Sequence, residues 1–208
     1  MARDCDAKCR KCRRENDKLF LKGERCYSKC PIDGGLNYAP GEHGQNRTKE
    51  SEYGLQLRAK QRVRRTYGLL EKQFRLVYDK ASRTKGVTGE NMLQLLERRM
   101  DNVVYSLGFA DSRAEARQLV RHNHFRVNDK KMNIPSYILK AGDVVTVNEK
   151  SREIAPIVRA MGNVDKRGVP GWMELDKAAF KGTIRALPVR EDISSAFKEQ
   201  LVVELYSK

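Results

Sequence analysis

Apolar positions recur at helical spacing through the second quarter of the chain. One-sided stripes with intervals of three and four residues run through residues 69–82 and 88–100, which predicts two amphipathic helices. The stripes consist of Leu70, Phe74, Val77 and Ala81 in the first helix, and of Met92, Leu95, Leu96 and Met100 in the second. We expect both faces to pack into a core.

The middle of the chain combines helical and strand patterns. Ser112 followed by Glu115 has the spacing of a capping box, so a helix is predicted to begin there. Asn123 can adopt the left-handed conformation that ends helices. The short apolar runs 125–127 and 144–147 predict two strands. This stretch is therefore expected to form a small unit of helix and strands.

The last quarter of the chain continues this mixture. Residues 151–161 have a short helical pattern. Residues 172–176 and 183–187 alternate like strands, and residues 181–182 between them are predicted to form a turn. A closing helix is predicted over residues 197–206. Helices and strands mixed in this way correspond to an α+β fold.

The 208 residues carry a formal net charge of +15, and the sequence pI is about 9.7. Residues 51–100 alone hold 12 Lys/Arg and 5 Asp/Glu, a net of +7. Such an excess predicts a polyanionic partner, because binding to phosphates releases condensed counterions. No apolar run approaches the roughly 18 residues needed to span a bilayer, which argues against a membrane partner. The N-terminus has no apolar signal region, so a cytoplasmic protein is expected.

Basic side chains concentrate in two of the predicted helices. The pattern over residues 49–67 is helical, and five cations spread around its circumference: Arg58, Lys60, Arg62, Arg64 and Arg65. A helix that is basic all round is poorly stable alone, so we expect a polyanion to surround it. Arg113, Arg117 and Arg121 form a stripe on the helix after Ser112, without a carboxylate on the same stripe. A solvated helix face is the alternative for both sets.

Four of the five cysteines form two closely spaced pairs, Cys9-x2-Cys12 and Cys26-x3-Cys30. Disulfides are disfavoured in the cytosol, and four thiolates form the tetrahedral site that structural zinc prefers. We therefore predict one structural zinc ion that holds a basic loop too small to fold alone. An iron–sulfur cluster and free reduced thiols are the alternatives, and Cys5 could replace Cys9 as a ligand.

Three runs in the middle of the chain form a recognisable pattern: residues 107–120 (LGFADSRAEARQLV), 127–128 (VN) and 142–144 (GDV). In this order they resemble the S-four RNA-binding domain. This domain occurs in a ribosomal protein, in RNA-modifying enzymes, in a tyrosyl-tRNA synthetase and in a heat-shock protein. The module by itself therefore implies RNA binding but leaves the task open.

The likeness extends over nearly the whole chain. Outside the module it is carried by Cys9-x2-Cys12 and by residues 22–28 (KGERCYS), 40–45 (PGEHGQ), 53–61 (YGLQLRAKQ), 98–104 (RRMDNVV) and 199–204 (EQLVVE). In this order they resemble the S-four family of bacterial small-subunit ribosomal proteins, in its zinc-binding cysteine variant. The second cysteine pair has a three-residue spacer where zinc-bearing members have four, which affects the ligand geometry more than the ligand types.

The resemblance implies a helical N-terminal domain with a cysteine and zinc knuckle, followed by an S-four type (alpha-L) RNA-binding domain of helices and a small, mostly antiparallel sheet. The implied domains are residues 1–46 (zinc knuckle and extended linker), 47–97 (basic helical domain) and 98–192 (RNA-binding domain with its β extension). The C-terminal helix within residues 193–208 is expected to pack back on the basic helical domain.

The resemblance also implies a structural constituent of the small ribosomal subunit. Such a protein is a primary binder of 16S rRNA that nucleates assembly of the subunit body and contributes to translational accuracy with ribosomal protein S-five. Two further partners are implied: ribosomal protein S-three, and messenger RNA near the channel through which it enters the subunit. We expect no membrane, no small-molecule substrate and no enzymatic activity, because the chain lacks a Gly-rich phosphate loop and a Ser/His/Asp set. An RNA-modifying enzyme and a free regulator that binds DNA or messenger RNA are the alternatives.

The expected site residues are therefore of two kinds. The zinc ligands are Cys9, Cys12, Cys26 and Cys30. The residues expected to bind RNA are the cations of the knuckle, the basic helix and the module: Arg10, Arg13, Arg14, Arg47, Lys49, Arg58, Lys60, Arg62, Arg64, Arg65, Arg98, Arg99, Arg113, Arg117, Arg121, His122 and His124.

Overall fold

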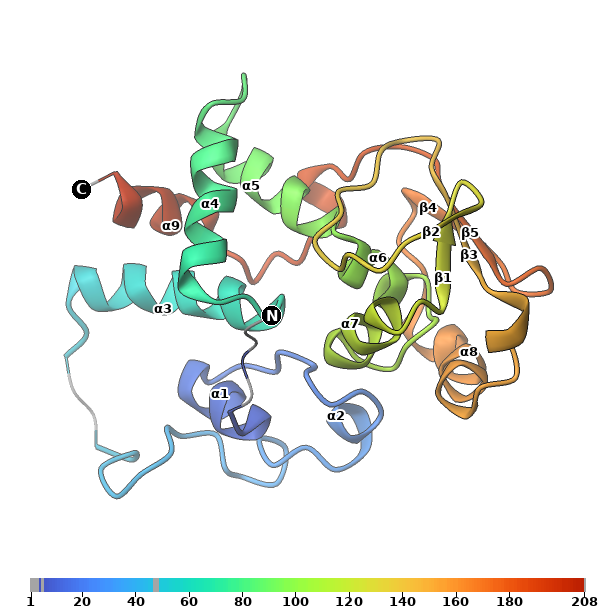
Figure 1. Cartoon of the computed structure of the whole chain (residues 1–208). Coiled ribbons are helices and arrows are strands. Elements are labelled where there is room, and N and C mark those ends of the chain that lie inside the picture. Colours follow the sequence, from blue (N-terminus) through green and yellow to red (C-terminus); the bar gives the residue numbers. More distant parts are fainter. Residues whose placement is uncertain (1–3, 5, 47–48, 208) are drawn as a thin grey trace. The chain divides into compact units, whose positions relative to one another are not determined.

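The computed structural model describes Asp4, residues 6–46 and residues 49–207. Its helices are α1 (Lys8–Glu15), α2 (Arg25–Ser28), α3 (Glu52–Thr66), α4 (Glu71–Ser82), α5 (Thr88–Glu97), α6 (Met100–Ser106), α7 (Arg113–Arg121), α8 (Ala155–Arg167) and α9 (Glu199–Tyr206), with short 3-10 turns η1 (Glu149–Ser151) and η2 (Arg190–Asp192). Its strands are β1 (Phe125–Val127), β2 (Lys130–Lys131), β3 (Val144–Val147), β4 (Met173–Asp176) and β5 (Lys181–Ile184) (Figure 1). The predicted α+β class is confirmed.

The chain divides into two compact units, and the boundary falls within α5. The helical unit comprises Met1–Met92 and Ser194–Lys208, and the helix–sheet unit comprises Leu93–Ile193. Each unit has its own buried apolar side chains, such as Phe74 in the first and Phe109 in the second.

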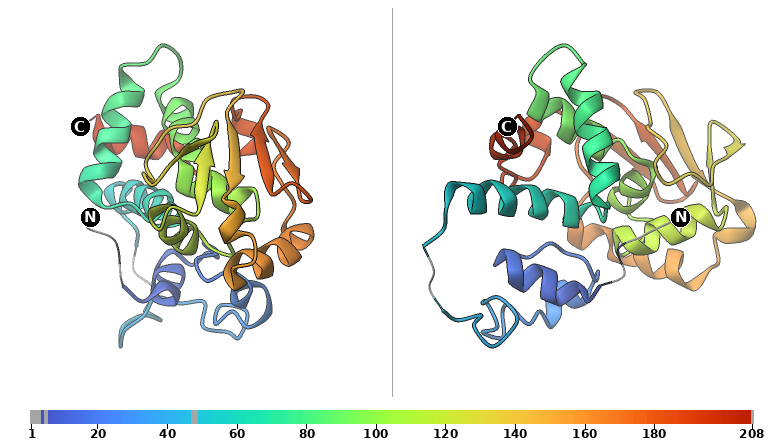
Figure 2. Two further views of the ribbon diagram at one scale, coloured as in Figure 1. Left: turned by 45° about the vertical axis from the view of Figure 1, so that its right-hand side comes forward. Right: turned by 60° about the vertical axis from the view of Figure 1, so that its left-hand side comes forward.

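In the helical unit, the last helix returns to the first half of the chain. α9 packs along α3, and its residue Val202 is fully buried. Gln56 of α3 donates a hydrogen bond to the Glu204 carboxylate at 3.0 Å. Tyr206 contacts Tyr78 of α4, with ring centroids 4.7 Å apart. The views in Figures 1 and 2 show α9 beside α3 and α4.

The helix–sheet unit contains one antiparallel sheet with the strand order β2-β1-β3-β5-β4. β1 and β2 are joined by a tight turn in which Asn128 and Asp129 have φ values of 48° and 62°. Positive φ at both positions is what the common two-residue hairpin turn requires. The strands from the last quarter of the chain, β4 and β5, extend the sheet beyond β3.

One face of this sheet is buried against the helices of its unit. Phe125, Val127, Val145 and Val147 point inward and join a core that includes residues of α6 and α7. The residues between them on the same strands face outward, because side chains alternate along a strand. The outer face therefore carries the polar positions of the strands.

The start and the end of α7 are as predicted. Ser112 Oγ accepts a hydrogen bond from the backbone N–H of Glu115 at 3.3 Å. The Glu115 carboxylate accepts one from the backbone N–H of Asp111 at 2.9 Å, one residue before the position that a standard capping box uses. Asn123 follows the helix with a φ of 62°.

Three helical boundaries differ from the sequence prediction. The helix expected over residues 49–67 begins only at Glu52, because Ser51 caps it by accepting from the N–H of Gly54. Met100 begins α6 instead of ending the helix before it. The helix expected over residues 151–161 is α8, which follows η1 and continues to Arg167.

The cysteine region and β5 also differ from expectation. The region predicted as a basic loop contains α1 and α2. Residues 181–182, predicted as a turn, are the first two residues of β5, and Gly182 pairs with Val145 and Leu175. A Cβ at Gly182 would lie 2.3 Å from the Leu107 side chain, which is fully buried. The glycine is there because the core approaches the strand closely, and not because the backbone turns.

This close approach predicts that Gly182→Ala destabilises the protein. The new methyl group would overpack a core position, which typically costs about 1–3 kcal/mol of unfolding free energy. Gly162→Ala is the control, because Gly162 is an exposed position of α8 where an added Cβ would have no neighbour within 4 Å. It should stabilise the protein by roughly 0.5–1 kcal/mol through helix propensity. Urea denaturation of both variants measures the difference, and equal stabilities would contradict the packing argument.

Candidate nucleic-acid interface and cysteine cluster

The four predicted zinc ligands lie together. Cys9 and Cys12 are on α1, Cys26 is on α2 and Cys30 follows α2, and all four line one cavity of about 20 Å³. Each of them is a free thiol. Cys12 is buried and the other three are partly exposed. The two pairs that are separate in the sequence therefore meet in the folded chain.

Four sulfur donors are the type of ligand that a thiophilic metal ion prefers. Burial raises the pKa of the Cys12 and Cys26 thiols, and the neighbouring cysteines raise it further. Within residues 6–46 and the rest of the described chain, no group of three or more His, Cys, Asp or Glu side chains is already arranged around a single ion. The four sulfurs share a cavity, but they would have to converge to hold a metal.

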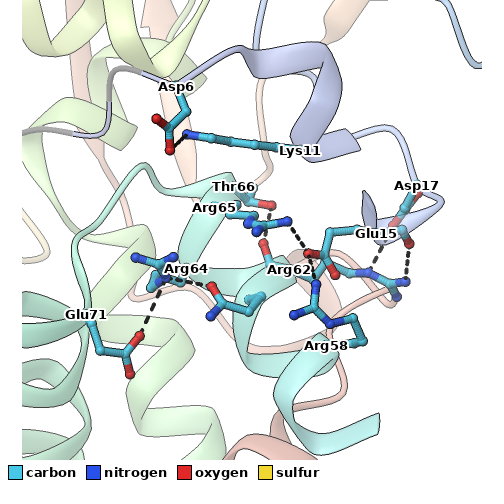
Figure 3. A network of polar contacts seen from close by, with 11 residues as sticks. Asp6, Lys11, Glu15, Asp17, Arg58, Arg62, Arg64, Arg65, Thr66 and Glu71 are labelled. Atoms are coloured by element: carbon cyan, nitrogen blue, oxygen red, sulfur yellow. Dashed lines mark hydrogen bonds and ion pairs between the residues drawn. The ribbon is translucent and has the colours of Figure 1, made fainter. Parts of the chain in front are cut away.

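A buried carboxylate joins the cysteine region to the basic helix. The side chain of Glu15, the last residue of α1, is fully buried, and its Oε1 accepts hydrogen bonds from Arg58 at 3.0 Å and from Arg65. Arg62 donates to the Glu15 backbone carbonyl at 3.2 Å and lies 3.5 Å from the Asp17 carboxylate. Figure 3 shows these side chains of α3 converging on the end of α1. Burial raises the pKa of the Glu15 carboxyl, and the arginines oppose that effect.

The other two cations of α3 pair with the first residue of α4. Glu71 accepts a hydrogen bond from Lys60 at 2.6 Å, and its second oxygen lies 3.6 Å from Arg64 Nε. Tyr206 of α9 donates to the same carboxylate at 2.8 Å. Burial works to raise the pKa of Glu71, but the hydrogen bonds from Lys60 and Tyr206 outweigh it and hold the pKa below its usual value.

These ion pairs change the interpretation of the basic helix. The sequence predicted that a polyanion would have to surround α3, but carboxylates of the same unit already contact all five of its cations. The helix is thus stabilised within the protein. RNA contact by these five side chains stays a prediction, and a guanidinium has five N–H donors, more than one carboxylate can occupy.

In the helix–sheet unit, α6 supplies the carboxylate that the arginine stripe of α7 lacks on its own helix. Asp101 is buried and accepts two hydrogen bonds from Arg99, at 3.1 and 3.0 Å, and one from Arg117 at 3.1 Å. Arg99 is itself only 4% exposed. Arg99 and Arg117 are therefore part of the packing between α6 and α7.

Arg113 is also held by α6. Its Nε donates to Asn102 Oδ1 at 2.7 Å, and its guanidinium lies 4.5 Å from the centre of the Tyr105 ring. Arg121 at the end of α7 is exposed, and it has no hydrogen bond or ion pair with the side chains the structure describes. Of the predicted stripe, only Arg121 is fully available to a partner without breaking an internal contact.

The remaining residues expected to bind RNA fall into two groups. Exposed side chains belong to Arg10, Arg14, Lys49 and His122. Partly buried side chains with hydrogen bonds inside the protein belong to Arg13 (to the Tyr38 carbonyl), Arg98 (to the Leu139 carbonyl) and His124 (to the Ser151 hydroxyl). Arg47 lies outside the described residues.

Sequence reasoning missed a second set of exposed cations, on the outer face of the sheet. Arg126, Lys131 and Lys181 have exposed side chains on β1, β2 and β5. The signal was present in the alternation of β1, because Phe125 and Val127 facing inward require Arg126 to face outward. These exposed cations lie on strands of the sheet, whereas Arg121 and His122 lie at the end of α7.

The chain matches the models of two protein families. Residues 3–97 match the ribosomal protein S4/S9 N-terminal domain, and residues 98–145 match the S4 domain. The fold thus combines the two domains that characterise one class of ribosomal proteins.

Full-length relatives narrow this class to one family. The chain is 64% identical to the small ribosomal subunit protein uS4 of Geobacter sulfurreducens, 62% to that of Geotalea daltonii and 59% to that of Desulforapulum autotrophicum, each time over 209 aligned positions and 100% of both chains. The chain belongs to the uS4 family of small ribosomal subunit proteins. Because the family consists of ribosomal proteins, the expectation of a structural protein without enzymatic activity is confirmed.

No helix in the described ranges is both long enough and apolar enough to cross a membrane.

The buried Asp101 cluster predicts a large effect of Asp101→Asn. The variant keeps the shape of the side chain but removes the buried negative charge that both Arg99 and Arg117 contact, which should cost about 3 kcal/mol of unfolding free energy. Asp129→Asn is the matched control, because Asp129 is exposed in a turn at positive φ, where Asn is well tolerated. Its stability should stay within about 0.5 kcal/mol of the parent in chemical denaturation. Similar losses in both variants would contradict the role of the buried charge.

Proposed function

We propose that this protein is a structural constituent of the small ribosomal subunit that binds 16S rRNA. The observation that carries the proposal is the match to uS4 relatives over the full length of both chains. The net charge of +15 supports it, because a polyanionic partner neutralises that excess. The family also supports the expected location in the small ribosomal subunit.

The chemistry of the exposed cations is compatible with such a partner. Folded RNA is recognised largely through its shape and its backbone, so lysine and arginine side chains matter more than aromatic stacking platforms. Aromatic residues make up 7% of the chain, in keeping with this mode. The exposed cations at the end of α7 would contact phosphates, whereas the buried arginines would hold the helices of the unit together.

Finer roles follow from the family resemblance and are part of the same proposal. The protein would bind 16S rRNA early and nucleate assembly of the subunit body. It would contribute to translational accuracy together with ribosomal protein S-five. Ribosomal protein S-three would be a further neighbour, and so would messenger RNA near its entry channel on the small subunit.

A structural zinc ion is the second element of the proposal. Cys9, Cys12, Cys26 and Cys30 would be its ligands, and the shared cavity that they line supports this set. Four thiolates leave no open coordination position, so the ion would have a structural task. It would link α1 to α2 and, because Glu15 ends α1, it would support the contact of α1 with α3.

Binding to RNA can be tested through its dependence on salt. The full-length protein should bind a small-subunit rRNA junction fragment with an affinity that falls steeply as the salt concentration rises, since each neutralised phosphate adds to the slope. Filter binding at several potassium concentrations measures that slope. A slope equivalent to fewer than about two phosphates would contradict the proposed function.

Metal analysis tests the zinc proposal. The purified protein should contain close to one equivalent of zinc, and Cys12→Ser should lose it because one of four ligands is removed. Cys5→Ser is the control, and it should keep the ion if Cys9 is the ligand. Zinc retained in Cys12→Ser would contradict the ligand set, and a brown protein with visible absorption would favour an iron–sulfur cluster instead.

A further inference from the structure

A row of basic side chains crosses the outer face of the sheet. Strand register places Lys131 of β2 opposite Arg126 of β1, Arg126 opposite Thr146 of β3, and Thr146 opposite Lys181 of β5. Cross-strand partners share one face of a sheet. Adjacent strands lie about 4.7–4.9 Å apart, so the row from Lys131 to Lys181 spans three spacings, about 14 Å. We call these four residues the outer row.

The outer row contains a pair of like charges that lie directly opposite each other on neighbouring strands. Like charges directly opposite each other destabilise an antiparallel pair, and Lys131 faces Arg126 in this way. Arg126 Nε donates to Asn148 Oδ1 at 2.7 Å, but Asn148 is uncharged. Neither Arg126 nor Lys131 has an ion pair among the side chains that the structure describes. The repulsion is therefore left uncompensated inside the protein.

This arrangement differs from the crowded cations of α3 and from those at the contact of α6 with α7. On α3 they meet Glu15, Asp17 or Glu71, and between α6 and α7 Arg99 and Arg117 meet Asp101. A local arrangement that lowers stability without an internal compensation is typical of a functional site. A charge arranged in a row, on an exposed and regular surface, fits a partner that carries negative charges in a row.

We propose that the outer row binds the sugar–phosphate backbone of an RNA strand. Lys131, Arg126 and Lys181 supply the charges, and the Thr146 hydroxyl between them supplies a further hydrogen-bond donor. The proposal rests on the proposed binding of small-subunit rRNA and adds a surface to it, separate from the helix stripe of α7.

Carboxylates on β4, at the edge of the same sheet face, indicate where the bound strand would end. Lys181 pairs with Asp176 of β4, and the neighbouring outward pair is Thr183 with Glu174. Glu174 is already paired with Arg185 at 2.8 Å. On β4 the carboxylates are already matched by cations and leave no positive excess for phosphates, so the proposed strand lies over β2, β1 and β3 and ends at β5.

A double neutral variant tests the proposal in the full-length protein. Arg126→Gln with Lys131→Gln removes two charges from the row and should flatten the salt dependence of binding to the rRNA junction fragment by about two phosphates, with roughly tenfold weaker binding at moderate salt. Lys72→Gln with Lys166→Gln is the control, because it removes the same charge from exposed positions of α4 and α8. The inference is wrong if the row variant keeps the parental slope, or if the control flattens it equally.

A single charge reversal separates binding from folding. Lys131→Glu places opposite charges across the pair with Arg126, so it should raise the melting temperature by about 1–3 °C while weakening RNA binding. A merely structural role would move stability and binding in the same direction. Loss of both stability and binding would therefore overturn the inference.

The parent protein separates this inference from the proposed function itself. If the parent binds the fragment with a steep salt dependence and the row variants do as well, only the outer row is excluded. If the parent shows no such binding, the proposed function fails first.

Discussion

Buried carboxylates hold the arginines that lie between the helices of this protein. Glu15 in the helical unit and Asp101 in the helix–sheet unit each hold two arginines. At separations of a few ångströms those arginines would otherwise repel one another strongly, because little water is present to screen them. A missing carboxylate would leave several buried charges unpaired, which is among the most damaging changes a folded chain can suffer. The position of α1 on α3, and of α7 on α6, depends on these two residues.

The same constraint divides the cations into two populations. Those that meet a buried carboxylate, such as Arg65 and Arg117, fix one helix against another. Those that do not, such as Arg121 and Arg126, remain on the surface and give the protein its excess charge. Charge density along the chain therefore does not by itself separate the cations that hold the fold together from those that are available to a polyanionic partner.

Most of the secondary structure was predicted from patterns of apolar and capping residues that are only a few positions apart in the sequence. The stripe with Phe74 predicts α4, Ser112 and Glu115 mark the start of α7, and alternation marks β1 and β3. Spacing also predicted that the two cysteine pairs belong together, and they share a cavity. Each of these signals lies within one turn, one helix or one strand, where backbone geometry determines which side chains share a face.

Contacts between distant segments could not be predicted in the same way. Nothing near Arg58 in the sequence indicates Glu15, 43 residues earlier, and nothing near Gly182 indicates Leu107. Turns are the commonest use of glycine, so the sequence pattern favours a turn at Gly182, while the actual cause is a neighbour that approaches only after folding. The outer row was missed for a related reason, since its members come from strands as far apart as residues 126 and 181.

The return of α9 to α3 has a consequence for the order in which the chain acquires its structure. A nascent chain grows from its N-terminus, so all of Leu93–Ile193 is synthesised before α9 exists. The sheet and its helices can close as soon as they have been made. The face of α3 that receives Val202 stays uncovered until α9 has been synthesised. The helical unit, which begins before the helix–sheet unit in the chain, is therefore completed after it.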